Sequence, residues 1–128
     1  MVNMTSEQLR RLARTLLEAA GTPNEVAATV AESLVESNLM GHDSHGVMRL
    51  LDYAPRVKSG LIRPDAKPEI VRESPGAAVV DGRWNFGQIV ARVAMQVAVG
   101  KARRGGVAAV TTFHTNHVGR LGEYAAMA

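Results

Sequence analysis

The sequence contains no cysteine and only five aromatic residues among its 128 residues. The absence of cysteine excludes a disulfide-stabilised scaffold and any zinc or iron–sulfur site held by thiolates. Charged residues make up 21% of the chain, an ordinary fraction, and no block of like charge is present, so wholesale disorder is not expected. A chain of this length can bury a core and corresponds to one domain or to part of a larger one.

The sequence also has few features of a protein that binds nucleic acids or membranes. Its net charge is only +3, and the basic residues are scattered rather than interleaved with aromatics, so we expect no nucleic-acid partner and only weak attraction of small anions. The longest apolar-rich segment, 89–99, is interrupted by Arg92 and Gln96, and the N-terminus lacks the pattern of a signal peptide. We therefore expect no membrane partner and a cytoplasmic location.

The sequence predicts two helix starts near the N-terminus. Thr5 with Gln8 three residues later predicts a capping box, and Gly21 predicts the end of that helix. Thr22, followed by Pro23 at the expected first helical position, predicts the cap of a second helix that ends near residue 41.

A third helix is expected to follow Ser44. Pro55 should kink or restart it, because the proline ring blocks the normal hydrogen bond, and Gly60 should end it. We therefore expect residues 1–60 to form a helical subdomain and residues 61–128 to form the first part of an α/β domain.

The second part alternates short apolar runs with a long helical pattern. Pro75 and Gly76 suit the centre of a type II turn, because glycine tolerates the positive φ that this turn requires. The expected elements are strands 69–72 and 77–81, a helix over 85–104, a strand over 107–112 and a last helix from about residue 119. The fold class is therefore α/β (α+β): a helical subdomain followed by the start of a mixed sheet with helices. We expect this fold to be incomplete, since the last helix has no stop signal.

All four histidines fall into two His-x-x-His pairs, each next to an expected helix start. His45 or His117 could act as a general acid–base group, because imidazole titrates near neutrality. If residues 45–49 are helical, His45 and Arg49 share a face, and the Arg49 guanidinium could clamp a carboxylate while Ser44 caps the helix or binds the substrate. This arrangement suits a small anion that undergoes proton-coupled chemistry beside its carboxylate.

Two other hypotheses explain the histidines and Ser44 differently. The histidines could bind a metal, with Asp43 as a further ligand, but no His-Glu-x-x-His pattern is present. Ser44 could be a nucleophile with His45 as its base, but adjacent side chains seldom face each other and no nucleophile elbow surrounds Ser44. A purely structural interpretation also remains, since a serine here is most often a helix cap and a lone histidine near a helix start is usually structural or merely exposed.

Nucleotide-binding motifs are nearly absent. Neither a Rossmann glycine fingerprint nor a P-loop occurs, and only Gly119 and Gly122 could let a phosphate approach a helix N-terminus.

Three successive motifs resemble those of the type 2 malate/L-lactate dehydrogenase family. They are Asp43-Ser44-His45-Gly46-Val47-Met48-Arg49-Leu50, then Val80-Asp81-Gly82 with Gly87, and then Gly106-Val107 leading to Thr115-Asn116-His117-Val118-Gly119. The resemblance covers nearly the whole chain. It implies an NAD(P)-dependent oxidoreductase with a fold unlike the Rossmann dehydrogenases, a homodimer, and an active site in a cleft between domains.

The resemblance also implies roles for individual residues. Arg49 would hold the substrate carboxylate, with Tyr53 one turn further as a weaker substrate contact, and Ser44 and His45 would lie near the reacting carbonyl or imine. His117 is the other candidate proton carrier. Asn116 and Gly119 are the candidates for contact with the cofactor, which would be NAD or NADP, and no metal is expected.

The chain departs from the family in its loop and in its length. The family loop more commonly reads Asn-Ser-Asn-His-Phe-Gly, whereas this chain reads His114-Thr115-Asn116-His117-Val118-Gly119. Family members are more than twice as long, so most cofactor-binding residues would lie beyond Ala128. We therefore expect the N-terminal part of a reductase of small 2-oxo acids or cyclic imines, with an inert truncated fragment and a histidine-rich metal-binding module as alternatives.

Overall fold

The computed structural model describes residues 3–128. The chain divides into two compact units, Met1–Asp65 and Ala66–Ala128, and each is described by itself. The class is mixed α/β, as expected, with an open three-stranded sheet. No helix among residues 3–128 is long and apolar enough to cross a membrane.

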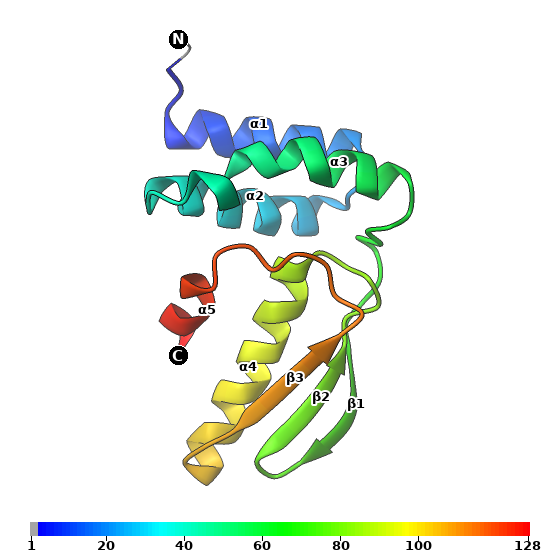
Figure 1. Ribbon diagram of the computed structural model, residues 1–128, viewed down its shortest axis with the longest axis vertical. Coiled ribbons are helices and arrows are strands. Elements are labelled where there is room, and N and C mark those ends of the chain that lie inside the picture. The colour runs from blue at the N-terminus through cyan, green and yellow to red at the C-terminus, as the bar shows by residue number, and fades with distance from the viewer. Residues whose placement is uncertain (1–2) are drawn as a thin grey trace. The chain divides into compact units, whose positions relative to one another are not determined.

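The first unit is built from three helices, α1 (Ser6–Ala19), α2 (Asn24–Leu39) and α3 (Leu50–Lys58) (Figure 1). The predicted capping box of α1 is confirmed, because the Thr5 side chain accepts from the Gln8 amide at 3.2 Å and the Gln8 side chain accepts from the Thr5 amide at 2.9 Å. Gly21 follows the helix with a φ of +106°, a conformation that glycine adopts without strain.

The start of α2 differs from the prediction. Pro23 occupies the cap position with an extended ψ of 146°, and Thr22 makes no capping bond. The Thr22 amide instead donates to the Leu17 carbonyl at 3.0 Å, so Thr22 completes the end of α1. Within the described chain the Thr22 hydroxyl is buried without a hydrogen-bond partner.

The segment expected to begin the third helix forms two single 3-10 turns, Asp43–His45 and Val47–Arg49. Gly46 separates them in an extended conformation, with a φ of −88° and a ψ of −158°, so one continuous helix from Ser44 is wrong. The restart at Pro55 is also wrong, because α3 runs through that residue. Proline has no main-chain N–H, so the Leu51 carbonyl lacks the hydrogen bond that residue 55 would otherwise donate. Leu51 is 84% exposed, so water can donate to this carbonyl instead.

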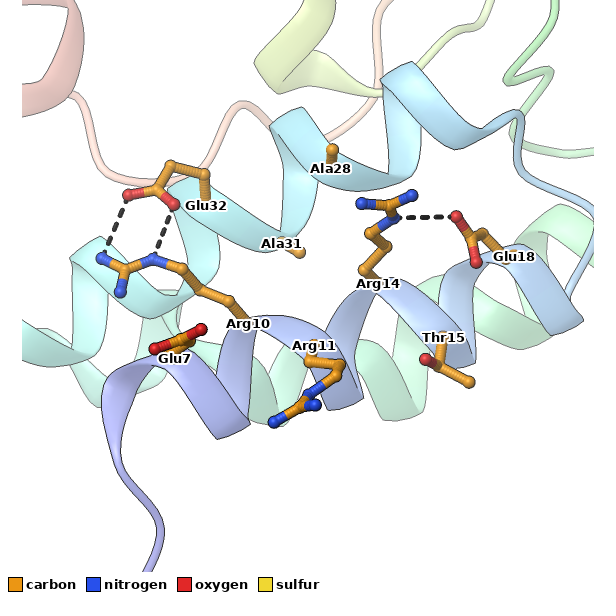
Figure 2. Close-up of a pocket in the computed structure, with 9 residues that line it drawn as sticks. All are labelled: Glu7, Arg10, Arg11, Arg14, Thr15, Glu18, Ala28, Ala31 and Glu32. Atoms are coloured by element: carbon orange, nitrogen blue, oxygen red, sulfur yellow. Dashed lines mark hydrogen bonds and ion pairs between the residues drawn. The ribbon is translucent and has the colours of Figure 1, made fainter.

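A charged groove lies between α1 and α2 (Figure 2). Its volume is about 550 Å³, and Ala28 and Ala31 of α2 are among the residues that line it. Arg10 of α1 donates to both carboxylate oxygens of Glu32 on α2, at 2.6 and 3.1 Å, and so ties the two helices together. None of the candidate site residues named above lines this groove.

The second unit contains the sheet. Its elements are β1 (Glu69–Ser74), β2 (Ala77–Asp81), α4 (Gly87–Gly105), β3 (Ala109–Phe113) and α5 (Gly122–Met127). The strand order is β1-β2-β3, with β1 antiparallel and β3 parallel to β2 (Figure 1). The predicted hairpin is therefore confirmed. The type II turn is wrong, because Gly76 has no positive φ, and a type II turn would splay two strands joined by a two-residue loop.

Helix α4 connects β2 to β3 and packs against both strands. The contact is close: a methyl group on Gly82, just after β2, would lie 2.7 Å from Val90 and 2.8 Å from the His114 carbonyl. Because β2 and β3 are parallel, their carboxyl ends lie at one edge of the sheet, and residues 114–119 leave from that edge. In open α/β sheets this edge is where ligands bind.

Candidate active site

In the first unit, the two 3-10 turns bring together three of the predicted site residues. The Ser44 hydroxyl and His45 Nδ1 lie 3.0 Å apart, and Arg49 Nε donates to the main-chain carbonyl of Ser44 at 2.7 Å. His45 and Arg49 were expected to share a face of one helix, but they lie in two separate 3-10 turns. The turn geometry and the Arg49 bond to the main chain assemble the cluster instead.

The Ser44 contact orients the His45 imidazole. With the hydroxyl as donor to Nδ1, the neutral ring carries its proton on Nε2, the nitrogen on the opposite side of the ring. The expectation that these neighbours do not face each other is wrong, because Nδ1 is the ring nitrogen nearest the backbone and a short serine side chain reaches it. The nucleophile reading still lacks its structural context, since Ser44 lies in a 3-10 turn rather than in a strand-to-helix elbow.

Arg49 keeps most of its donors after binding the main chain. Nε is one of five N–H donors of a guanidinium, and the other four are on the two terminal nitrogens. A guanidinium that is anchored at Nε has lost much of its side-chain freedom, so less entropy is lost when it binds a carboxylate. Tyr53 lies one turn further along, in α3, and is buried, with 2% of its surface exposed.

A residue that the sequence analysis missed holds the two turns together. The Asn38 side chain, near the end of α2, donates to Asp43 Oδ1 at 2.6 Å and accepts from the Val47 amide at 2.9 Å. The available signal was an asparagine inside a helix pattern, where it is a poor helix former.

The second unit carries the other predicted residues in the loop after β3. Asn116 Nδ2 donates to the main-chain carbonyls of Trp84 and Asn85 at 2.8 and 3.1 Å, so its amide protons fasten the loop to the segment after β2. The loop also contacts the start of α4, since a methyl group on Gly87 would lie 2.3 Å from the His117 carbonyl. His117 itself is exposed.

The expected phosphate approach at the last helix has a different geometry. Helix α5 begins at Gly122 rather than near Gly119, and it has only six residues. Gly119 has a φ of +78° and is buried, with Gln88 3.3 Å from the position of a methyl group. The Tyr124 hydroxyl donates to the Val118 carbonyl and holds α5 against the loop.

These contacts test whether the described residues fit a dinucleotide. Asn116 uses both amide protons on main-chain carbonyls, and Gly119 is turned against Gln88. Both contacts fit loop positioning better than direct phosphate binding.

His114, at the start of the same loop, forms a second polar cluster. Its Nδ1 lies 3.1 Å from Asp81 Oδ1, and its ring packs against Trp84 and Phe113 with centroid separations of 5.1 and 4.6 Å. The main-chain amide of Arg83 donates to the Asp81 carboxylate at 2.8 Å. This bond, assisted by His114, holds the pKa of Asp81 below its usual value.

Sequence comparison places these features in a family. The model of the malate/L-lactate dehydrogenase family matches residues 4–128. The malate dehydrogenase of Pyrococcus abyssi is 39% identical over 127 residues, which is 99% of this chain and 35% of that protein. The L-sulfolactate dehydrogenase of Methanocaldococcus jannaschii is 38% identical over 122 residues, which is 95% of this chain and 36% of that protein.

Solved structures agree with the sequence comparison. Malate dehydrogenase from Pyrococcus horikoshii OT3 matches with a TM-score of 0.94 at 35% identity, covering 99% of this chain and 36% of that one. The delta1-piperideine-2-carboxylate reductase from Pseudomonas syringae matches with a TM-score of 0.87 at 27% identity, covering 97% of this chain and 37% of that one.

The fold and the sequence thus define a dehydrogenase-type α/β chain. It belongs to the malate/L-lactate dehydrogenase family, which confirms the resemblance carried by the motifs at 43–50, 80–87 and 106–119. The chain spans little more than a third of the length of the relatives it matches.

Proposed function

We propose that this chain is the N-terminal part of an NAD(P)-dependent oxidoreductase. It would act on small 2-hydroxy and 2-oxo acids or related carboxylates, including cyclic imines. The family match supports the reaction class, and relatives are named as malate, sulfolactate and piperideine-2-carboxylate enzymes. The observation that carries the proposal is the Ser44–His45–Arg49 cluster, which places an anion-binding group and a titratable ring on one pair of turns.

Each residue of the cluster has a task in this proposal. Arg49 binds the substrate carboxylate through its terminal nitrogens, which form a bidentate match. Ser44 fixes the His45 ring, and His45 passes a proton to the oxygen or nitrogen that gains negative charge as the carbonyl or imine is reduced. Bound NAD or NADP would supply or accept the hydride. Tyr53 supports the substrate side, and His117 is the alternative proton carrier.

The remaining expectations belong to the same proposal. Asn116 and Gly119 would serve the cofactor indirectly by shaping the loop that carries His117. The whole protein would be a cytoplasmic homodimer whose partner is a small carboxylate rather than a nucleic acid or a membrane.

The test is a substrate screen with the full-length protein that contains this chain. Oxidation of NADH and NADPH is followed at 340 nm with oxaloacetate, pyruvate, sulfopyruvate and piperideine-2-carboxylate, with acetone as the matched control that lacks a carboxylate. We expect turnover of at least one carboxylate and none of acetone. Turnover of acetone equal to that of the acids, or of none of these compounds, would contradict the proposal.

The inert-fragment alternative concerns the 128-residue chain alone, and the chain's coverage of only 35% and 36% of two of its relatives favours it for this length of chain. The metal-binding alternative receives no support from the structure. Among the described residues no group of three or more histidine, aspartate or glutamate side chains could hold a metal ion.

A further inference from the structure

We propose that Asn38 is the positioning residue of the candidate active site, locking the two 3-10 turns that carry Ser44, His45 and Arg49 into one arrangement. The effect of Asn38 on catalysis rests on the function proposed above. Its role in fixing the two turns does not, because the contacts can be tested without measuring activity.

The Asn38 amide joins one turn to the other. Nδ2 donates to Asp43 Oδ1 at 2.6 Å in the first turn, and Oδ1 accepts from the Val47 amide at 2.9 Å in the second turn. The Val47 amide begins its turn and has no partner within it, since the first amides of any helical turn lack internal acceptors. Both ends of one planar group are therefore used, and each end fixes a different turn.

The Asn38 side-chain amide lies close to Gly46, which separates the two turns. A methyl group at Gly46 would lie 2.3 to 2.5 Å from the Asn38 side chain, whereas real Cβ contacts are never so short. The Gly46 backbone, with a φ of −88°, is open to any residue. A side chain at position 46 would therefore have to displace the Asn38 amide, whereas the backbone conformation itself places no demand on the residue.

The support behind Asn38 is firm. The Gly41 amide donates to the Asn38 carbonyl at 2.9 Å, and the His42 amide donates to the Ser37 carbonyl at 2.8 Å, which together close the end of α2. Ser37 is fully buried and its hydroxyl bonds to Ser33. The Asn38 side chain therefore extends from a helix end that is fixed by hydrogen bonds, and it can restrain the two turns.

The first experiment is a double-mutant cycle with Asn38→Ala and Gly46→Ala in the 128-residue chain. The readouts are the thermal midpoint and the ¹⁵N shifts of the His45 imidazole, which report the tautomer. We expect Gly46→Ala to lower the midpoint and shift the His45 signals in the wild-type background. In the Asn38→Ala background it should do much less, because the opposing side chain is gone. Equal effects in both backgrounds would overturn the proposal.

The second experiment reverses the hydrogen bond. Asn38→Asp faces the Asp43 carboxylate with a second negative charge, so we expect the His45 signals to shift and the midpoint to fall. Adding Asp43→Asn restores a donor and an acceptor in exchanged positions, and the wild-type His45 signals should return. Failure of this rescue, with Asp43→Asn alone no worse than wild type, would also overturn the proposal.

Kinetics of the full-length protein separate this inference from the proposed function. If the protein is a reductase, Asn38→Ala should lower kcat/KM on the order of 100-fold, the scale of a misplaced catalytic group, and the exchanged pair should recover most of it. If no reductase activity exists but the imidazole signals obey both cycles, the positioning role stands and the proposed function fails. If reductase activity is found but the mutations act additively in both cycles, the proposed function stands and the positioning role of Asn38 fails.

Discussion

At the scale of single residues, the fold favours the charged form of the Asp81 carboxylate. It accepts from the Arg83 amide at 2.8 Å and lies 3.1 Å from His114 Nδ1, while Arg83 itself pairs with Glu69. These partners lower the pKa of Asp81 from its usual 3.8. A carboxyl with a lowered folded-state pKa stabilises the fold above its unfolded pKa, and this contribution disappears as the pH falls through the folded value.

Asp81→Asn should therefore flatten the acid side of the stability profile. Between about pH 5 and the folded-state pKa, the wild-type chain should lose stability more steeply than the variant. Urea unfolding followed by circular dichroism at several pH values measures this difference. Parallel profiles would show that Asp81 does not contribute to acid sensitivity.

His114 tests a backbone requirement at the same place. Its φ is +46°, in the left-handed region that asparagine tolerates and β-branched residues do not. We expect His114→Asn to keep most of the thermal midpoint and His114→Val to lower it by several degrees more. Equal midpoints for the two variants would indicate that the left-handed backbone places no demand on this position.

At the scale of elements, the start of α4 is fitted to the loop after β3. A methyl group on Gly87 would lie 2.3 Å from the His117 carbonyl and 2.4 Å from the Asn116 carbonyl, whereas one on Gly100 of the same helix would meet nothing within 4 Å. Main-chain atoms cannot rotate away as a side chain can, so a methyl group added at Gly87 would have to distort the loop.

Gly87→Ala and Gly100→Ala therefore form a matched pair. We expect the first to destabilise the chain by about 1–3 kcal/mol or more, as overpacking does. The second should stabilise it by roughly 0.5–1 kcal/mol, the usual gain from alanine within a helix. Chemical denaturation measures both. A Gly87→Ala chain as stable as wild type would refute the fitted contact.

Local signals in the sequence predicted most of the elements but not the turns at the site. The capping box at Thr5 and the hairpin at 69–81 depend on neighbouring residues, and both are confirmed. The break at Gly46 depends on the side chain of Asn38, which a helical periodicity does not report. The sequence thus identified Ser44, His45 and Arg49 as a group, but assigned them the wrong backbone.

At the scale of the whole molecule, family membership was predictable because three motifs keep their order along the chain. The roles of the individual site residues stay predictions. The chain covers about 35% of the length of its relatives, and our proposal places most of the groups that would bind a dinucleotide in the rest of such a protein.

A dinucleotide titration of the 128-residue chain checks this division of labour. Trp84 is 43% exposed and packs against His114 in the second unit, so its fluorescence reports on the loop region. We expect no saturable quenching by NADH or NADPH at micromolar concentrations, and tight binding by the full-length protein. Micromolar binding by the short chain would mean that it contains a phosphate site of its own.

The central claim is that Arg49 binds the substrate carboxylate while His45 moves the proton. Steady-state kinetics of the full-length protein with Arg49→Lys and His45→Gln measure it most directly. We expect Arg49→Lys mainly to raise KM, because the bidentate fork is lost. We expect His45→Gln to lower kcat about 100-fold or more and to remove the pH dependence of kcat. Wild-type KM in the first variant together with an unchanged pH profile in the second would contradict it.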